Sequence, residues 1–165
     1  MSVNGSPPQP FLAKTRFFHY LSTFMLKLVS QLPVSVLFLY CIVVAFLLIY
    51  LPFLAVAYAR LSVGYDYFAP RAMFEKLPPY AQRATWAHQN SFENFMIFAA
   101  AALMAYVTGV DSPLAAGAAL TFITVRLLYS VFYILNIPIL RSLMYAIGLG
   151  CYSTLFVLSI IRVSS

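Results

Sequence analysis

Charged residues are missing from long stretches of this sequence, and their absence limits the fold more than any other feature. No Asp, Glu, Lys or Arg occurs between Lys27 and Arg60, and about 20 apolar residues suffice for a helix to cross a bilayer. Only 8% of the chain is charged, against about 25% in an average soluble domain. The composition therefore predicts an integral membrane protein. It excludes a soluble domain, a disordered chain and, despite a net charge of +6, a nucleic-acid binder.

Prolines and polar turns divide the apolar sequence at 32–165 into four predicted membrane helices. They are expected at about 34–59, 83–108, 113–136 and 139–161. Asp111 or Ser112 is expected to cap the third helix, with Pro113 at its first position. We therefore expect an all-α, left-handed up-down four-helix bundle that crosses the membrane several times. The balance of positive residues on the two sides fixes neither its orientation nor which membrane it occupies.

The first 31 residues differ from the rest and are predicted to lie outside the bundle. Residues 1–10 are rich in proline and are expected to form a disordered lead. On a helical wheel, residues 11–31 separate a basic and polar side from a side with aromatic and aliphatic residues. This pattern favours an amphipathic helix at the membrane surface. A cleavable signal or organelle-targeting segment is the alternative.

Polar side chains inside two predicted spans are the candidate functional residues, because a lone charge at that depth costs at least about 2.5–3.5 kcal/mol. In the second span, helical spacing places one polar set on a single face: Arg83, Asn90, Glu93 and Asn94. In the third span, the same rule groups Arg126, Tyr129 and Tyr133. At about 1.5 Å per residue, Glu93 and Arg126 each lie about 15 Å from the same end of the bundle.

We therefore predict that Glu93 faces Arg126 inside the bundle, within a half-buried polar pocket. The pocket is expected to contain Arg83, Asn90, Glu93, Arg126, Tyr129, Tyr133, Arg141 and Ser142. Its excess of guanidinium groups favours an anionic, peptide-like ligand, because arginine binds carboxylates bidentately. The alternative is that Glu93 and Arg126 form a purely structural pair. His88 points away from this face and is expected to be structural.

Two stretches of the sequence resemble the MAPEG family, the membrane-associated proteins in eicosanoid and glutathione metabolism. The first runs from Ala69 to Phe95 and contains the run AHQNSFENF; the second runs from Val125 to Ser142 and reads VRLLYSVFYILNIPILRS. The resemblance covers about residues 34–162 and is greatest for the bacterial-type branch. This sequence departs from it at Ala69, where many bacterial members have Asn, and at Trp86, where several members have Arg.

The resemblance implies a homotrimer of four-helix protomers that binds glutathione, as a cosubstrate, between neighbouring protomers. By position, Asn90 and Glu93 would hold the glutathione backbone, and Arg60 would reach in from the neighbour. The third helix would line the site with Arg126, Tyr129 and Tyr133. By position, Arg141 with Ser142 would approach the reacting sulfur, and we take these two residues and Tyr133 as the catalytic residues. Arg83 is expected to bind the cosubstrate as part of the same pocket.

No metal site is expected, because neither histidine has a second ligand at metal spacing. No protein nucleophile is evident either, so the nucleophile is expected to be the glutathione thiolate, stabilised by Arg141. Such help matters because an ordinary thiol has a pKa near 8.5, so only a small fraction of it is thiolate at neutral pH. We therefore predict a glutathione transferase, with peroxidase activity, acting on lipophilic electrophiles or lipid hydroperoxides from the bilayer. The alternatives are a non-catalytic lipid-binding protein and a structural membrane subunit of the same fold.

Overall fold

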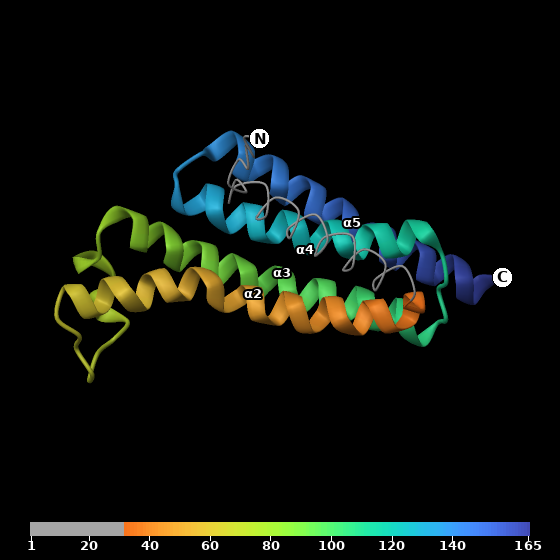
Figure 1. Cartoon of the computed structure of the whole chain (residues 1–165), viewed down its shortest axis with the longest axis horizontal. Coiled ribbons are helices and arrows are strands. Elements are labelled where there is room, and N and C mark those ends of the chain that lie inside the picture. The colour runs from red at the N-terminus through yellow and green to blue at the C-terminus, as the bar shows by residue number, and fades with distance from the viewer. Residues whose placement is uncertain (1–31) are drawn as a thin grey trace, which may run out of the picture. The chain divides into compact units, whose positions relative to one another are not determined.

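The computed structural model describes residues 32–165, in which Val34–Ser165 form one compact unit. This unit contains the long helices α2 (Val34–Ser62), α3 (Pro79–Val107), α4 (Pro113–Ile134) and α5 (Pro138–Ser164), and the short 3-10 helix η1 (Ala72–Lys76). Successive long helices run in opposite directions (Figure 1). No strand occurs in the described part of the chain, so the expected all-α bundle is confirmed. The lead and interfacial helix predicted at 1–31 lie outside the described residues.

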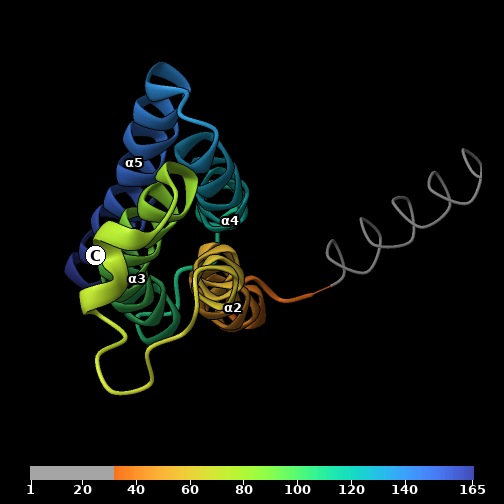
Figure 2. The same ribbon diagram turned by 90° about the vertical axis from the view of Figure 1, so that its left-hand side faces the viewer.

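Three of the helices, α2, α4 and α5, are long and apolar enough to cross a membrane. Helix α3 is as long as α2, but its first half carries the polar residues discussed above. It packs against all three of the other long helices, whereas α2 and α5 lie at opposite corners of the bundle (Figure 2). The buried face of α3 is mostly alanine, and small residues allow membrane helices to approach closely. The protein is therefore a multi-pass membrane protein with its most polar helix against every other helix.

Prolines determine where the helices begin. Helix α3 starts at Pro79 rather than near Arg83, because proline has the fixed φ of a helix and its missing N–H is not needed at the first helical position. Pro113 occupies the same position in α4. Just before it, Ser112 caps the helix: its Oγ accepts a hydrogen bond of 3.1 Å from the N–H of Ala115.

Aromatic packing joins the middle of α3 to α4 and α5. The rings of Phe98 and Phe122 stack with centroids 3.9 Å apart and planes 5° from parallel, and both side chains are buried. The ring of Tyr152 meets Phe122 edge-on at 6.3 Å. Because lipid tails are as apolar as these side chains, close packing rather than the hydrophobic effect holds such helices together. These contacts hold α3, α4 and α5 together next to the polar residues, which lie nearer the 63–78 loop.

His88 ties α3 to α2 next to an internal proline. Pro52 lies inside α2, where it removes one backbone hydrogen bond and favours a bend. In the preceding turn, Nδ1 of His88 lies 2.8 Å from the carbonyl oxygen of Ile49. A carbonyl only accepts, so Nδ1 carries the proton. This contact agrees with a structural role for His88.

Replacing His88 by leucine should lower the free energy of unfolding by about 1 kcal/mol, because one hydrogen bond between helices is lost. His88→Gln, whose amide still donates a proton, should keep more of the stability. Thermal unfolding in detergent measures both effects. If the leucine variant unfolds at the wild-type temperature, the contact with Ile49 contributes nothing to holding the two helices together.

Candidate functional site

The structure divides the predicted polar pocket into two cavities at the end of the bundle that carries the 63–78 loop. The smaller, of about 280 Å³, lies between α3, α4 and α5, and we call it the tyrosine cavity. It is lined by Asn90, Tyr129, Tyr133, Arg141, Ser142 and Tyr145. Five of these six residues belong to the set expected from the sequence. The larger, of about 900 Å³, lies between α2, the loop and α3, and we call it the loop cavity.

Three tyrosine rings and the guanidinium of Arg141 line much of the tyrosine cavity. The guanidinium carbon of Arg141 lies 4.6 Å from the centroid of the Tyr133 ring, a cation–π contact that fixes the arginine. Tyr129 meets Tyr133 edge-on at 5.5 Å and lies 6.4 Å from Tyr145. Arg141 is also in the first turn of α5, where the helix dipole adds positive potential. The cavity is therefore suited to a ligand with a negative group.

A tight turn between α4 and α5 sets the position of Arg141. Asn136 has a φ of 61°, in the left-handed region that asparagine enters more readily than most residues. The N–H of Ile137 donates to the carbonyl of Phe132 at 2.9 Å, and the N–H of Arg141 donates to the carbonyl of Ile137 at 3.1 Å. The chain thus reverses within a few residues, so that Arg141 lies beside the Tyr133 that precedes the turn.

Arg126 does not face Glu93, and this expectation from the sequence is wrong within the protomer. Nη2 of Arg126 donates to Oδ1 of Asn90 at 3.2 Å and to Oγ of Ser91 at 3.1 Å. The Arg126 side chain is only 4% exposed, whereas Glu93 is exposed and lines the loop cavity. Equal depth in the membrane fixes the height of two residues but not the rotation of their helices. The rotation of α3 directs Asn90, three residues before Glu93, toward Arg126 of α4.

Asn90 is held in one orientation by its neighbours. Its Oδ1 accepts from Arg126 and also from Nδ2 of Asn94, at 3.3 Å. Because a guanidinium only donates, the atom that faces it must be the amide oxygen. The Nδ2 group of Asn90 is then what this residue offers to a ligand in the tyrosine cavity. Arg126 positions Asn90 and does not line that cavity itself.

Arg83 lines neither of the two cavities. Its Nε donates to the carbonyl oxygen of Ile134 at 3.0 Å, at the last residue of α4. The final carbonyls of a helix lack partners within the helix and favour a positive group. Arg83 therefore fastens the start of α3 to the end of α4, which is a structural contact rather than the place in the pocket expected from its helical face.

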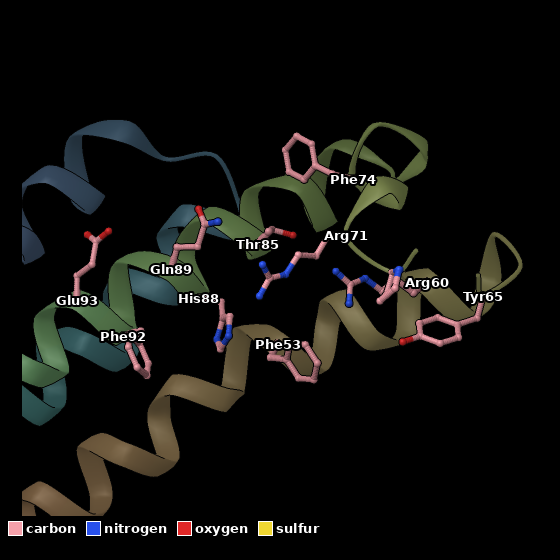
Figure 3. Close-up of a pocket in the computed structure, with 11 residues that line it drawn as sticks. Phe53, Arg60, Tyr65, Arg71, Phe74, Thr85, His88, Gln89, Phe92 and Glu93 are labelled. Atoms are coloured by element: carbon pink, nitrogen blue, oxygen red, sulfur yellow. The ribbon is translucent and has the colours of Figure 1, made fainter. Parts of the chain in front are cut away.

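The loop cavity holds the other two residues expected at the site, Arg60 and Glu93. Its full lining is Phe53, Arg60, Tyr65, Pro70, Arg71, Phe74, Thr85, His88, Gln89, Phe92 and Glu93. Figure 3 shows the guanidinium groups of Arg60 and Arg71 directed into the same space, with the Glu93 carboxylate at the far end. The loop therefore adds a second arginine, Arg71, which the helical periodicity could not reveal.

Tyr145 lines the tyrosine cavity and was not predicted from the sequence pattern either. It follows Arg141 at the spacing of one helical turn, so both side chains lie on one face of α5. That spacing is the signal that would have identified it. Tyrosine is also common where membrane helices meet water, and nothing else in the sequence distinguishes Tyr145 from the other tyrosines of this chain.

Comparison with known proteins identifies the family. The model of the MAPEG family matches residues 37–161, a range that includes the lining residues of both cavities. No curated protein and no solved structure matches the chain. The matched range runs from the first turn of α2 into the last turns of α5, and so covers the whole bundle apart from its ends. The chain belongs to the MAPEG family.

Proposed function

We propose that this protein is a glutathione-dependent transferase that acts on lipophilic electrophiles and, as a peroxidase, on lipid hydroperoxides. Membership of the MAPEG family is consistent with a glutathione-related role in a membrane, although some members are not enzymes. The observation that carries the proposal is the position of Arg141 in the tyrosine cavity, fixed on the ring of Tyr133. A guanidinium held there favours the thiolate form of a bound thiol. The assignment to the bacterial-type branch belongs to this proposal and rests on the two sequence motifs.

The tyrosine cavity also supplies groups that would hold the rest of glutathione. The amide Nδ2 of Asn90 is a donor for a carbonyl or carboxylate oxygen. The hydroxyl groups of Ser142 and Tyr133 line the same space and offer further hydrogen bonds. At about 280 Å³, however, this cavity is at the lower limit of the roughly 300–1,000 Å³ of ligand pockets. Its size fits one half of a site better than a complete one.

A second copy of the chain would complete the site from its loop cavity. Glu93 is exposed on α3 in the loop cavity, and a carboxylate without a partner at that depth in a membrane is costly. Packing this face against the tyrosine cavity of a neighbour would remove that cost and would bring Arg60 and Glu93 to the bound glutathione. The homotrimer implied by the resemblance closes such head-to-tail contacts into a ring. The alanine-rich face of α3 is already buried within each protomer and stays out of this contact.

The proposed chemistry follows from the charge beside the sulfur. The thiol proton leaves to solvent, and the thiolate is held near Arg141. Its sulfur then forms a bond to an electrophilic carbon of the substrate. That carbon either loses a leaving group or passes the electron pair into a conjugated system. With a lipid hydroperoxide, two glutathione molecules are oxidised to the disulfide. The hydroperoxide is reduced to an alcohol and water. The protein binds, orients and stabilises charge, and contributes no nucleophile of its own.

Millimolar glutathione should raise the melting temperature of the purified protein in detergent, because a ligand that binds only the folded state stabilises it. The gain is about 2.7 kcal/mol when the free ligand is at about one hundred times its Kd. The exposed Arg162, at the far end of α5, provides a matched control, since Arg162→Ala should leave the shift unchanged. If wild-type protein shows no shift, the proposal fails in favour of a lipid-binding or structural role.

A further inference from the structure

Two guanidinium groups share the loop cavity, and no carboxylate of the described residues lies beside them. Arg60 lies in the last turn of α2, and Arg71 lies immediately before η1. Both point into the same space in Figure 3, and Nε of Arg60 is buried without a hydrogen-bond partner among the described residues. Like charges repel, and a buried donor without a partner costs about 1–3 kcal/mol. Arg71 is exposed, so water screens part of this repulsion, and an anion between the two arginines would stabilise both of them.

The nearby carboxylates of the described chain do not take that position. Oδ1 of Asp66 accepts the backbone N–H groups of Phe68 and Ala69, at 2.9 and 3.2 Å, and so serves the turn of the loop. Glu75 is exposed on η1 and is not part of the cavity lining. Glu93 does line the cavity, but Figure 3 shows its carboxylate at the opposite end from the arginines. The space between the arginines is thus left for a ligand.

We infer that Arg60 and Arg71 together bind a carboxylate group of the substrate or cosubstrate, and that Arg71 makes the enzyme prefer ligands that carry it. Guanidinium groups bind carboxylate oxygens bidentately, and a pair of them can engage both oxygens from two sides. Phe53 and Phe74 also line the cavity, and both are partly buried, so charge interactions beside them are stronger than in open water. This inference rests on the proposed function and adds to it a specificity residue carried by the loop.

Two molecules in the proposed reaction present this chemistry. Glutathione has a carboxylate at each end, and one of them would reach the loop cavity of the neighbouring protomer. A fatty-acid hydroperoxide also has a carboxylate, at its head, and would reach the cavity from the bilayer. The recognised group is the same in both cases, so the experiment compares each acid with its own ester.

The test measures kcat and KM for wild type and Arg71→Gln with two matched pairs. One pair is glutathione and its glycine ethyl ester, with a neutral electrophile; the other is a fatty-acid hydroperoxide and its methyl ester, with glutathione. Glutamine keeps a polar side chain in the loop but removes the charge. Lys76→Gln is the control, because it removes one positive charge from exposed η1 outside the cavity lining.

In one of the two pairs, Arg71→Gln should lower kcat/KM for the acid about tenfold, mainly through KM, and should leave the ester unchanged. Arg71→Lys should restore part of the preference, and Lys76→Gln should change neither form. The pair that responds identifies which molecule supplies the carboxylate. Equal effects on acid and ester in both pairs would overturn the inference while leaving the proposed function intact. If the wild-type protein neither binds glutathione nor turns it over, the proposed function is wrong, and this inference fails with it.

Discussion

Replacing Arg141 by alanine should reduce turnover with glutathione at neutral pH by about 10²–10³-fold, the range found when one stabilising donor is removed from a charged transition state. Among the described residues, the guanidinium of Arg141 is the one positive group that lines the tyrosine cavity, and it is held 4.6 Å from the ring of Tyr133. Without it, the bound thiol should return toward its ordinary pKa of about 8.5. The bundle should remain folded, because Arg141 is only partly buried.

The dependence of the rate on pH distinguishes this role from a general loss of structure. The remaining activity of Arg141→Ala should rise with pH up to about 8.5, since the thiolate then forms without help. Arg141→Lys should retain more activity than alanine, because it keeps a positive charge. Initial rates between pH 6 and 9, beside the melting temperature of each variant, are the required measurements. If the Arg141→Ala variant is folded and turns over as fast as the wild type, Arg141 has no role in the mechanism.

Replacing Asn90 by aspartate should raise the Kd for glutathione by about tenfold or more without unfolding the protein. The aspartate keeps an oxygen for Nη2 of Arg126, so the bond between α3 and α4 persists. It replaces the amide Nδ2, which we expect to donate to the ligand, by a second oxygen. Loss of a hydrogen bond to a charged group costs about 1.5–3 kcal/mol, and 1.4 kcal/mol corresponds to tenfold in affinity.

A second variant separates the binding role of Asn90 from its structural one. Asn90→Leu leaves the buried Arg126 with the hydroxyl of Ser91 as its only hydrogen-bond acceptor among the described residues, so stability should fall by about 1–3 kcal/mol. Calorimetric titration with glutathione and thermal unfolding would report the two effects separately. If Asn90→Asp binds glutathione as tightly as wild type, Nδ2 does not contact the ligand.

Much of the fold could be read from the sequence because the membrane simplifies the problem. The apolar runs are bounded by prolines and polar turns, and each long helix begins at a proline or directly after one. The predicted start of α3, at about residue 83, is too late, because proline is favourable at the first helical position and Pro79 takes that place. The membrane-surface helix expected before residue 32 stays a prediction.

The site was harder to predict, because periodicity groups residues by helix face but does not say which neighbour a face meets. Asn90 and Glu93 share a face of α3, yet one bonds Arg126 and the other lines the loop cavity. Their different partners depend on how α3 is rotated against α2 and α4, which side-chain packing sets. Arg71 lies in a loop without any periodicity, so only the folded chain shows that it shares a cavity with Arg60.

The two cavities that border α3 have a consequence for rings of mixed copies if they meet across protomers as proposed. Each subunit then contributes to two different reaction centres, one through its tyrosine cavity and the other through its loop cavity. A defective copy built into an otherwise normal ring would damage both centres that it touches. Activity in mixed rings would therefore fall faster than the fraction of altered copies.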